Sequence, residues 1–165
     1  MAELSAASLP KLDLHGARAY RPLLYRIASS ARSDPSAASP FAGAGNIATG
    51  SVAEVSGSDV FSVAPGEWFV RLASPSALPE WHEAMLVSSC CDNHVEWRIS
   101  SDWLGAICSA YGSHAQRPLA PGRAMALGIA GERMMVVRPA SGEAWLYHEA
   151  ALLDWFAGLI RTIQM

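Results

Sequence analysis

The feature that most constrains the fold of this chain is a series of short apolar runs with β-strand periodicity, each bounded by turn residues. The clearest pair, at 60–63 and 68–72, flanks Pro65-Gly66 and predicts a β-hairpin. At 95–99, apolar and polar residues alternate, which is typical of a half-buried strand. Similar runs predict three further strands, at 125–129, 134–138 and 144–147.

Three other stretches carry apolar residues at helical spacing. The first opens at Pro79, and the second follows Ser100 or Ser101, whose hydroxyl can cap a helix that Gly112 can end. The three apolar stripes are Leu78, Trp81, Met85 and Leu86; Trp103, Leu104, Ile107, Cys108 and Tyr111; and Leu152, Trp155, Phe156, Leu159, Ile160 and Ile163. From residue 46 the predicted order is ββα-βα-βββα. We therefore expect an α+β fold with three helices packed against a mixed or antiparallel sheet.

The first 45 residues differ from the rest of the chain. Scattered apolar residues at 9–27 predict a short helix interrupted by Pro22. Small residues and prolines dominate 29–45, and such residues bury too little surface to offset the entropy of ordering the chain. We therefore predict an N-terminal arm, residues 1–45, and a single α+β domain, residues 46–165. A neighbouring subunit would hold such an arm in place.

The composition favours a chain that hides surface against partners. Of its 165 residues, 51% are hydrophobic and 16% are charged, whereas about 25% is the usual charged share. The net charge of -3 and the single lysine, Lys11, argue against binding to nucleic acid. No apolar run is long enough to span a bilayer, no signal peptide is evident, and three cysteines make no disulfide framework. We expect the protein in the cytoplasm.

The sequence contains no motif for catalysis, cofactor binding or metal ligation. The five histidines are scattered, and no CxxC or HExxH is present. Adjacent cysteines rarely form a disulfide because the ring is strained, so Cys90 and Cys91 are expected to be incidental at the end of a helix. Cys108 is expected in the core. We predict that the chain has no catalytic, cofactor-binding or metal site of its own.

Four residues are candidates for contacts with other subunits. Arg117 and Arg123 bracket a proline-rich loop, where they could clamp an anionic ligand; we favour loop solvation or a subunit contact. Trp68 and Trp145 lie in predicted strands whose outer face the sequence does not define. Either tryptophan could anchor an interface, although core packing is the default for this residue and is expected for the other four.

From about residue 60 onward, the chain resembles the gamma subunit of heterotetrameric sarcosine oxidase. The resemblance rests on the order of five motifs: Val63-Ala-Pro-Gly-Glu-Trp-Phe-Val70, Trp97-Arg-Ile-Ser100 followed by Trp103-Leu104, Arg117-Pro-Leu-Ala-Pro-Gly122, Val136-Val-Arg138 and Trp155-Phe-Ala-Gly-Leu159. Two segments depart from the family pattern, Ala110-Tyr-Gly-Ser113 and His148-Glu-Ala-Ala151.

The resemblance implies a fold related to the folate-binding domains of glycine-cleavage T protein. It also implies that partner subunits oxidise sarcosine or a related N-methyl amine. In that family a large alpha subunit carries NAD and folate, a beta subunit holds the flavins FAD and FMN, and a small delta subunit binds zinc. The gamma subunit carries no cofactor. Two alternatives stay open: a stand-alone folate-binding module that uses the Arg117 and Arg123 loop, and a small adaptor or chaperone.

Overall fold

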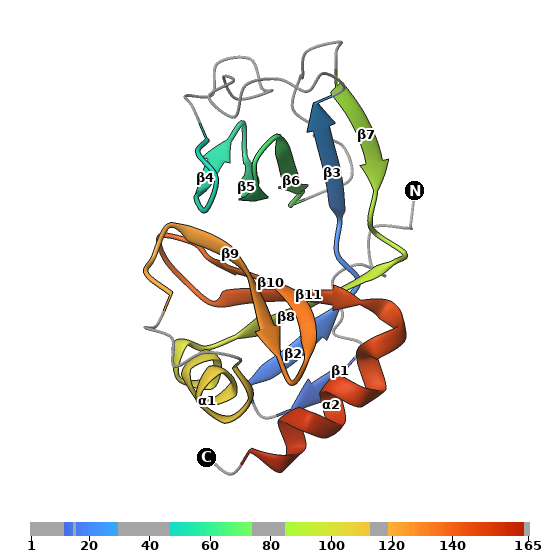
Figure 1. The fold of residues 1–165 in the computed structure, drawn as a ribbon, viewed down its shortest axis with the longest axis vertical. Coiled ribbons are helices and arrows are strands. Elements are labelled where there is room, and N and C mark those ends of the chain that lie inside the picture. Colours follow the sequence, from blue (N-terminus) through green and yellow to red (C-terminus); the bar gives the residue numbers. More distant parts are fainter. Residues whose placement is uncertain (1–11, 15, 30–46, 74–84, 113–118, 164–165) are drawn as a thin grey trace.

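The computed structural model describes residues 12–14, 16–29, 47–73, 85–112 and 119–163, which form two antiparallel sheets and two α-helices (Figure 1). Sheet A contains, in spatial order, β1 (Leu12–Leu14), β2 (Ala17–Tyr20), β8 (His94–Ile99), β11 (Ala144–Glu149), β10 (Glu132–Arg138) and β9 (Arg123–Ile129). Sheet B contains β4 (Val52–Val55), β5 (Ser58–Ala64), β6 (Glu67–Arg71), β3 (Leu24–Ser29) and β7 (Met85–Ser89). The helices are α1 (Ser101–Tyr111) and α2 (Leu153–Thr162), and a 3-10 turn, η1 (Ala150–Leu152), precedes α2.

These elements form layers, with the two helices against one face of sheet A and sheet B on its other face (Figure 1). The largest core cluster lies between the helices and sheet A, where Trp97, Ile107 and Phe156 are all fully buried. A second cluster, which includes Phe61 and Tyr147, fills the space between the sheets. Sheet A is therefore buried on both faces.

Two stretches of chain cross from sheet A to sheet B side by side. One runs from β2 into β3 and the other from β7 into β8; β2 pairs with β8, and β3 pairs with β7. At the crossing, the backbone N–H of Cys90 donates to the carbonyl of Leu24 over 2.8 Å. On the opposite side, an isolated bridge joins Ser51 to Arg123. The Cys90 bond extends the β3–β7 pairing within sheet B, whereas the Ser51 bridge joins the segment before β4 of sheet B to the start of β9 in sheet A.

Local signals explain several of these elements. The predicted hairpin at 60–63 and 68–72 is confirmed as β5 and β6, and its turn residue Gly66 has a φ of 71°, which glycine adopts without strain. The side chain of Ser100 caps α1 by accepting from the N–H of Trp103 over 3.2 Å. At the other end of α1, a Cβ on Gly112 would lie 2.4 Å from the carbonyl oxygen of Cys108, so only glycine fits there.

The prediction of an arm over residues 1–45 is wrong for the described part of that segment. Residues 12–14, 17–20 and 24–29 are strands within the two sheets, so the helix predicted at 9–27 is also wrong there. Leu24 packs between the sheets while Ile27 packs on the far face of sheet B, so this stretch is buried on both faces as a strand is. Residues 1–11, 15 and 30–45 of the predicted arm lie outside the described residues.

The prediction of three helices, with the order ββα-βα-βββα, also needs correction. Met85 and Leu86, placed on the face of a helix by their spacing, belong to strand β7, and residues 79–84 lie outside the described residues. Two α-helices are present in the described ranges, and neither is long and apolar enough to cross a bilayer. The α+β class and antiparallel pairing are confirmed.

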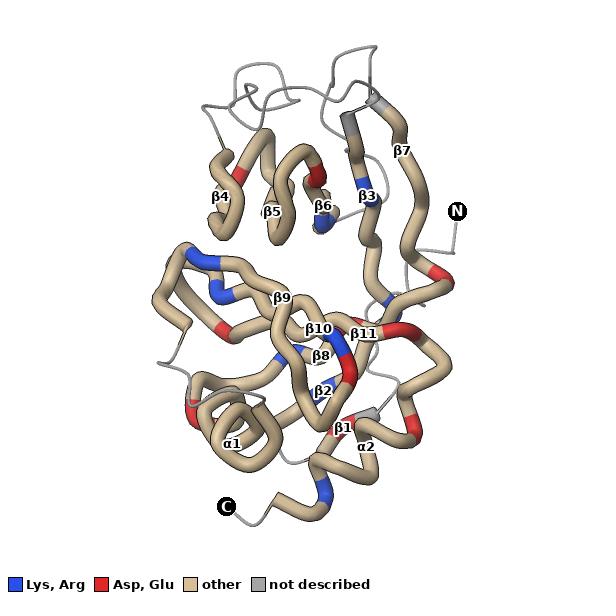
Figure 2. Tube along the Cα trace, viewed as in Figure 1, with Lys and Arg blue, Asp and Glu red and all other residues tan. Residues whose placement is uncertain are grey.

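Charged residues are sparse along long stretches of the described chain (Figure 2). Helix α1 has one acidic residue in its first turn and no basic residue in its last. Two large apolar side chains are exposed, Leu86 at 62% and Trp155 at 39%. Core packing was expected for Trp155, but its neighbour Phe156 is the residue that turns toward sheet A and is fully buried.

Candidate functional site between the two sheets

The candidate site lies between the sheets, because alternate residues of sheet A carry polar groups toward sheet B. Strand β8 directs Glu96 and His94 to this side, while Val95 and Trp97 pack under the helices. The same alternation on β11 brings Tyr147 and Glu149 into the space between the sheets. One end of the space is closed by an ion network, and the other end is open as a pocket.

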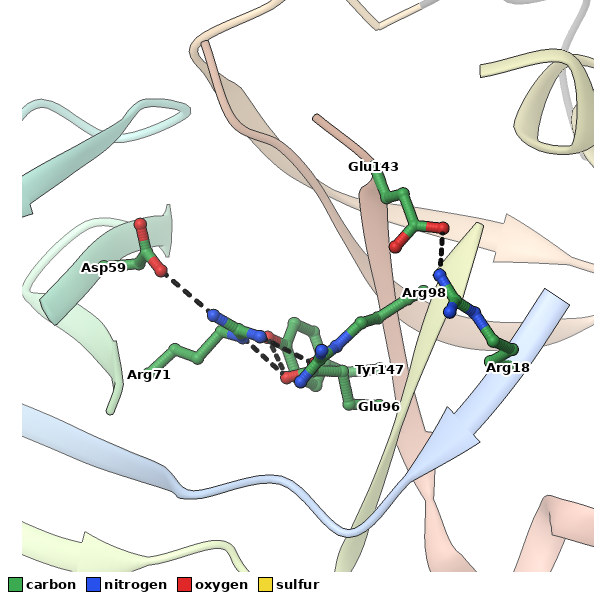
Figure 3. A network of polar contacts seen from close by, with 7 residues as sticks. All are labelled: Arg18, Asp59, Arg71, Glu96, Arg98, Glu143 and Tyr147. Atoms are coloured by element: carbon green, nitrogen blue, oxygen red, sulfur yellow. Dashed lines mark hydrogen bonds and ion pairs between the residues drawn. The ribbon is translucent and has the colours of Figure 1, made fainter. Parts of the chain in front are cut away.

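The ion network is centred on two oppositely charged residues from different sheets, Arg71 on β6 and Glu96 on β8 (Figure 3). The Arg71 guanidinium donates to both carboxylate oxygens, with Nε to Oε2 at 2.8 Å and Nη2 to Oε1 at 3.0 Å. Arg71 also pairs with Asp59 at 3.1 Å. Glu96 accepts two further bonds, from Arg98 Nε at 2.8 Å and from the hydroxyl of Tyr147 at 2.9 Å. Three strands, β6, β8 and β11, therefore meet at the Glu96 carboxylate, and Asp59 adds β5 to the network through Arg71.

Burial gives this network its electrostatic character. Only 2% of the Glu96 side chain and 15% of the Arg71 side chain are exposed. Burial alone would raise the pKa of Glu96, but hydrogen bonds and charge from Arg71 and Arg98 overcome it and hold that pKa below its usual range. Burial and the charge of Glu96 raise the pKa of Tyr147 well above its usual value, so its phenol stays protonated and donates.

Aromatic rings extend the contacts of both arginines. The guanidinium carbon of Arg71 lies 4.3 Å from the ring centre of Trp145, and that of Arg98 lies 4.1 Å from the ring centre of Tyr20. Trp145 belongs to sheet A, so Arg71 of sheet B holds sheet A through a ring as well as a carboxylate. Because Glu96 accepts from three side chains and lies out of contact with water, this cluster is suited to holding the sheets together rather than to proton transfer.

Next to the network, three aromatic rings stack across the space between the sheets. Phe61 lies between Phe69 and Tyr147, with ring centres 5.4 Å and 5.6 Å apart respectively. Phe61 and Phe69 come from sheet B, whereas Tyr147 comes from sheet A. The stack is the apolar centre of this interface, and it forms part of the floor of the pocket beyond it.

The pocket has a volume of about 280 Å³ and opens at the end of the inter-sheet space away from Asp59 and Arg98. Both sheets line it. Its residues are Arg26, Val63, Glu67, Phe69, Cys90, His94, Arg133, Met135, Tyr147, His148 and Glu149. The apolar side chains come from the middle of the inter-sheet space, and the charged ones lie around its mouth.

Two histidines line this pocket in different states of hydrogen bonding. His148 Nε2 accepts from the indole N–H of Trp97 over 2.8 Å, so its proton is on Nδ1, which donates to the carbonyl of Glu149. His94 Nδ1 is buried and has no hydrogen-bond partner. Burial lowers the pKa of both rings, so both are neutral near neutral pH.

The cysteines occupy inert positions. Cys90 and Cys91 are buried and free, and they follow strand β7 rather than the helix that was expected. Burial raises the pKa of the Cys90 and Cys108 thiols, which keeps both protonated at neutral pH. Cys108 packs beside the core under sheet A, as expected. Within the described ranges, no group of three or more His, Cys, Asp and Glu side chains could hold a metal ion.

Of the four expected interface residues, three lie within the described ranges, and these three do not come together. Trp68 and Trp145 are 4% and 8% exposed within the chain itself. The indole of Trp68 packs on the far face of sheet B and donates to the carbonyl of Ile47 over 3.3 Å. Arg123 is exposed at the start of β9, and Arg117 lies outside the described residues. No sequence signal marked Arg71 or Glu96, because the partners are far apart along the chain.

Together, the fold and this site define an α+β protein in which an ion network fastens two stacked antiparallel sheets. Comparison with protein-family models and with curated proteins gives no match. Among solved structures, the chain is similar to one in heterotetrameric sarcosine oxidase from Corynebacterium sp. U-96 in complex with pyrrole 2-carboxylate. The TM-score is 0.66 at 13% identity, over 94% of this chain and 87% of that chain. This likeness establishes the shared fold.

Replacing Arg71 with alanine should strongly destabilise the fold. Glu96 would stay buried with one of its two arginines lost, and breaking a buried pair in this way costs about 3–5 kcal/mol. The control is Arg21→Ala, which removes an ion pair to Asp92 whose side chains are 54% and 76% exposed and should cost under about 1 kcal/mol. Urea unfolding followed by circular dichroism measures both. Equal losses in the two variants would contradict the role assigned to Arg71.

The ionised form of Glu96 should make stability depend on pH in a defined direction. Its pKa is lower in the folded chain than in the unfolded chain, so its stabilisation is present above the ordinary value of about 4.3 and is lost as the pH falls through the folded value. We expect the free energy of unfolding of wild type to exceed that of Glu96→Gln by a constant amount above about pH 5, and by less below it. A difference that stays constant down to about pH 3 would show that Glu96 is not stabilised as an anion.

Proposed function

We propose that this chain is a non-catalytic gamma subunit of a heterotetrameric, sarcosine-oxidase-like flavoenzyme complex. The observation that carries the proposal is the shared fold with a chain of a heterotetrameric sarcosine oxidase, over 94% of this chain and 87% of that one. Since both coverages are high, the two chains are similar in length, which supports a small subunit as the counterpart rather than a domain of a much larger one.

The positions of the sequence motifs support the same assignment. The motif at 63–70 forms the β5–β6 turn and most of β6, and the motif at 97–100 joins β8 to the capped start of α1. The motifs at 136–138 and 155–159 lie in β10 and α2. These four motifs therefore coincide with elements of a fold that is shared with a chain of that complex.

A passive role also agrees with the chemistry between the sheets. The most buried charges, Glu96 and Arg71, bind each other and hold two sheets together. In the proposed complex, the oxidation of sarcosine or a related N-methyl amine takes place on partner subunits. FAD, FMN, NAD, folate and zinc would be held by the larger alpha and beta subunits and a small delta subunit, all in the cytoplasm.

The exposed residues suggest which parts of this chain meet those partners. Arg123 is exposed at the start of β9 and keeps its proposed interface role, which Arg117 would share. Trp155 and Leu86 are large exposed apolar side chains, the kind that a partner covers in an assembly. Trp68 and Trp145 are buried within the chain, so they would support the shape of a contact surface from below.

Purification of the tagged chain from its native host tests the proposal. We expect it to elute with larger subunits that carry visible flavin absorption and oxidise sarcosine or a related secondary amine. Mass spectrometry identifies the subunits, and a tagged Arg71→Ala variant should recover less of them because its fold is weakened, whereas Arg21→Ala should recover as much as wild type. A colourless eluate that contains this chain alone would refute the proposal.

A further inference from the structure

The pocket between the sheets has polar groups that the subunit role does not use. His94, Glu149 and Arg133 all line it. His94 and Glu149 are register partners on β8 and β11. The register that pairs Met135 with Tyr147 continues to place Arg133 on β10 at the level of Glu149. Three neighbouring strands thus present a neutral imidazole, a carboxylate and a guanidinium in one row along the mouth of the pocket.

The charged members of this row are unpaired. Among the described residues, none forms an ion pair or side-chain hydrogen bond with Arg133 or with the carboxylate of Glu149. On the facing sheet, Arg26 and Glu67 are bonded to each other, so their charges balance. The mouth of the pocket therefore offers one unpaired positive group, Arg133, and one unpaired negative group, Glu149.

The floor of the pocket is apolar. Val63 and Phe69 come from sheet B, and Met135 and the ring of Tyr147 come from sheet A. A volume of about 280 Å³ is near the lower end of the range for small-molecule sites, roughly 300–1,000 Å³. This space fits a compact organic molecule with an apolar body and polar groups at one end.

We propose that this pocket binds a small zwitterion with an apolar body. Its anionic group pairs with Arg133 and its cationic group pairs with Glu149, while its apolar body lies on the floor of the pocket. A plain anion would gain Arg133 but meet the repulsion of Glu149, and a plain cation would meet that of Arg133. Only a ligand with both charges pairs with Arg133 and Glu149 at the same time. The proposal does not depend on the subunit role.

Calorimetric titration of the full chain with three probes that share one apolar body tests the ligand class. L-Phenylalanine carries both charges, 3-phenylpropionate carries the anion alone, and phenethylamine carries the cation alone. We expect saturable binding of L-phenylalanine and at least about tenfold weaker binding of each single-charge probe. No saturable binding of L-phenylalanine, or equal binding of 3-phenylpropionate or phenethylamine, would overturn the proposal.

Substitutions locate the binding within the pocket. Arg133 and Glu149 are exposed, so Arg133→Gln and Glu149→Gln should fold normally while each weakens L-phenylalanine binding about tenfold. The control is Glu132→Gln, which changes an exposed carboxylate next to Arg133 that does not line the pocket. The methyl NMR signal of Met135 should shift on titration with wild type. If both pocket variants bind as wild type does, the site is elsewhere and the proposal fails.

Discussion

The ion pair between Arg71 and Glu96 is the contact on which the arrangement of the two sheets depends. It joins the middle of sheet B to the middle of sheet A, and the Glu96 carboxylate is almost fully buried. A buried carboxylate is tolerated only when its oxygens are satisfied, and here Arg71, Arg98 and Tyr147 satisfy them. The position of this pair sets the spacing of the sheets, and the aromatic stack and the pocket follow in the same space.

Strong local signals made much of the fold predictable. The β5–β6 hairpin, the alternation of β8, the serine cap of α1 and the stripe of α2 all follow from residues near one another in the sequence. Strands β2 and β3 were missed because Pro22 interrupts their pattern and their partners in β6, β7 and β8 lie between 39 (Ala28 to Glu67) and 82 (Ala17 to Ile99) residues away. The candidate site was missed for a related reason. The polar residues at 94, 96 and 98 predict a solvent-exposed face, and only the three-dimensional fold shows that sheet B covers it.

Because sheet B covers one face of sheet A, a chain with few charges still has charged residues in its interior. Sheet B converts one face of sheet A from a surface into an interior, so charges there must find partners or remain at the open end. Glu96 has three partners, whereas Arg133 and Glu149 lie at the mouth, where water reaches them. The space between the sheets therefore has two parts: the ion network holds the sheets together at one end, and the pocket at the other end is the proposed binding site. This division is compatible with a subunit whose complex carries out its chemistry on other chains.

A double-mutant cycle between Arg71 and Glu96 tests the central claim most directly. The cycle compares the free energies of unfolding of wild type, Arg71→Met, Glu96→Gln and the double variant. The effects of the two single substitutions are subtracted from that of the double variant, and the remainder is the coupling energy between the two side chains. The account predicts a coupling of at least about 1.5 kcal/mol, as expected for contacting members of one buried network. A coupling near zero would mean that apolar packing alone fixes the sheets, and it would contradict the account.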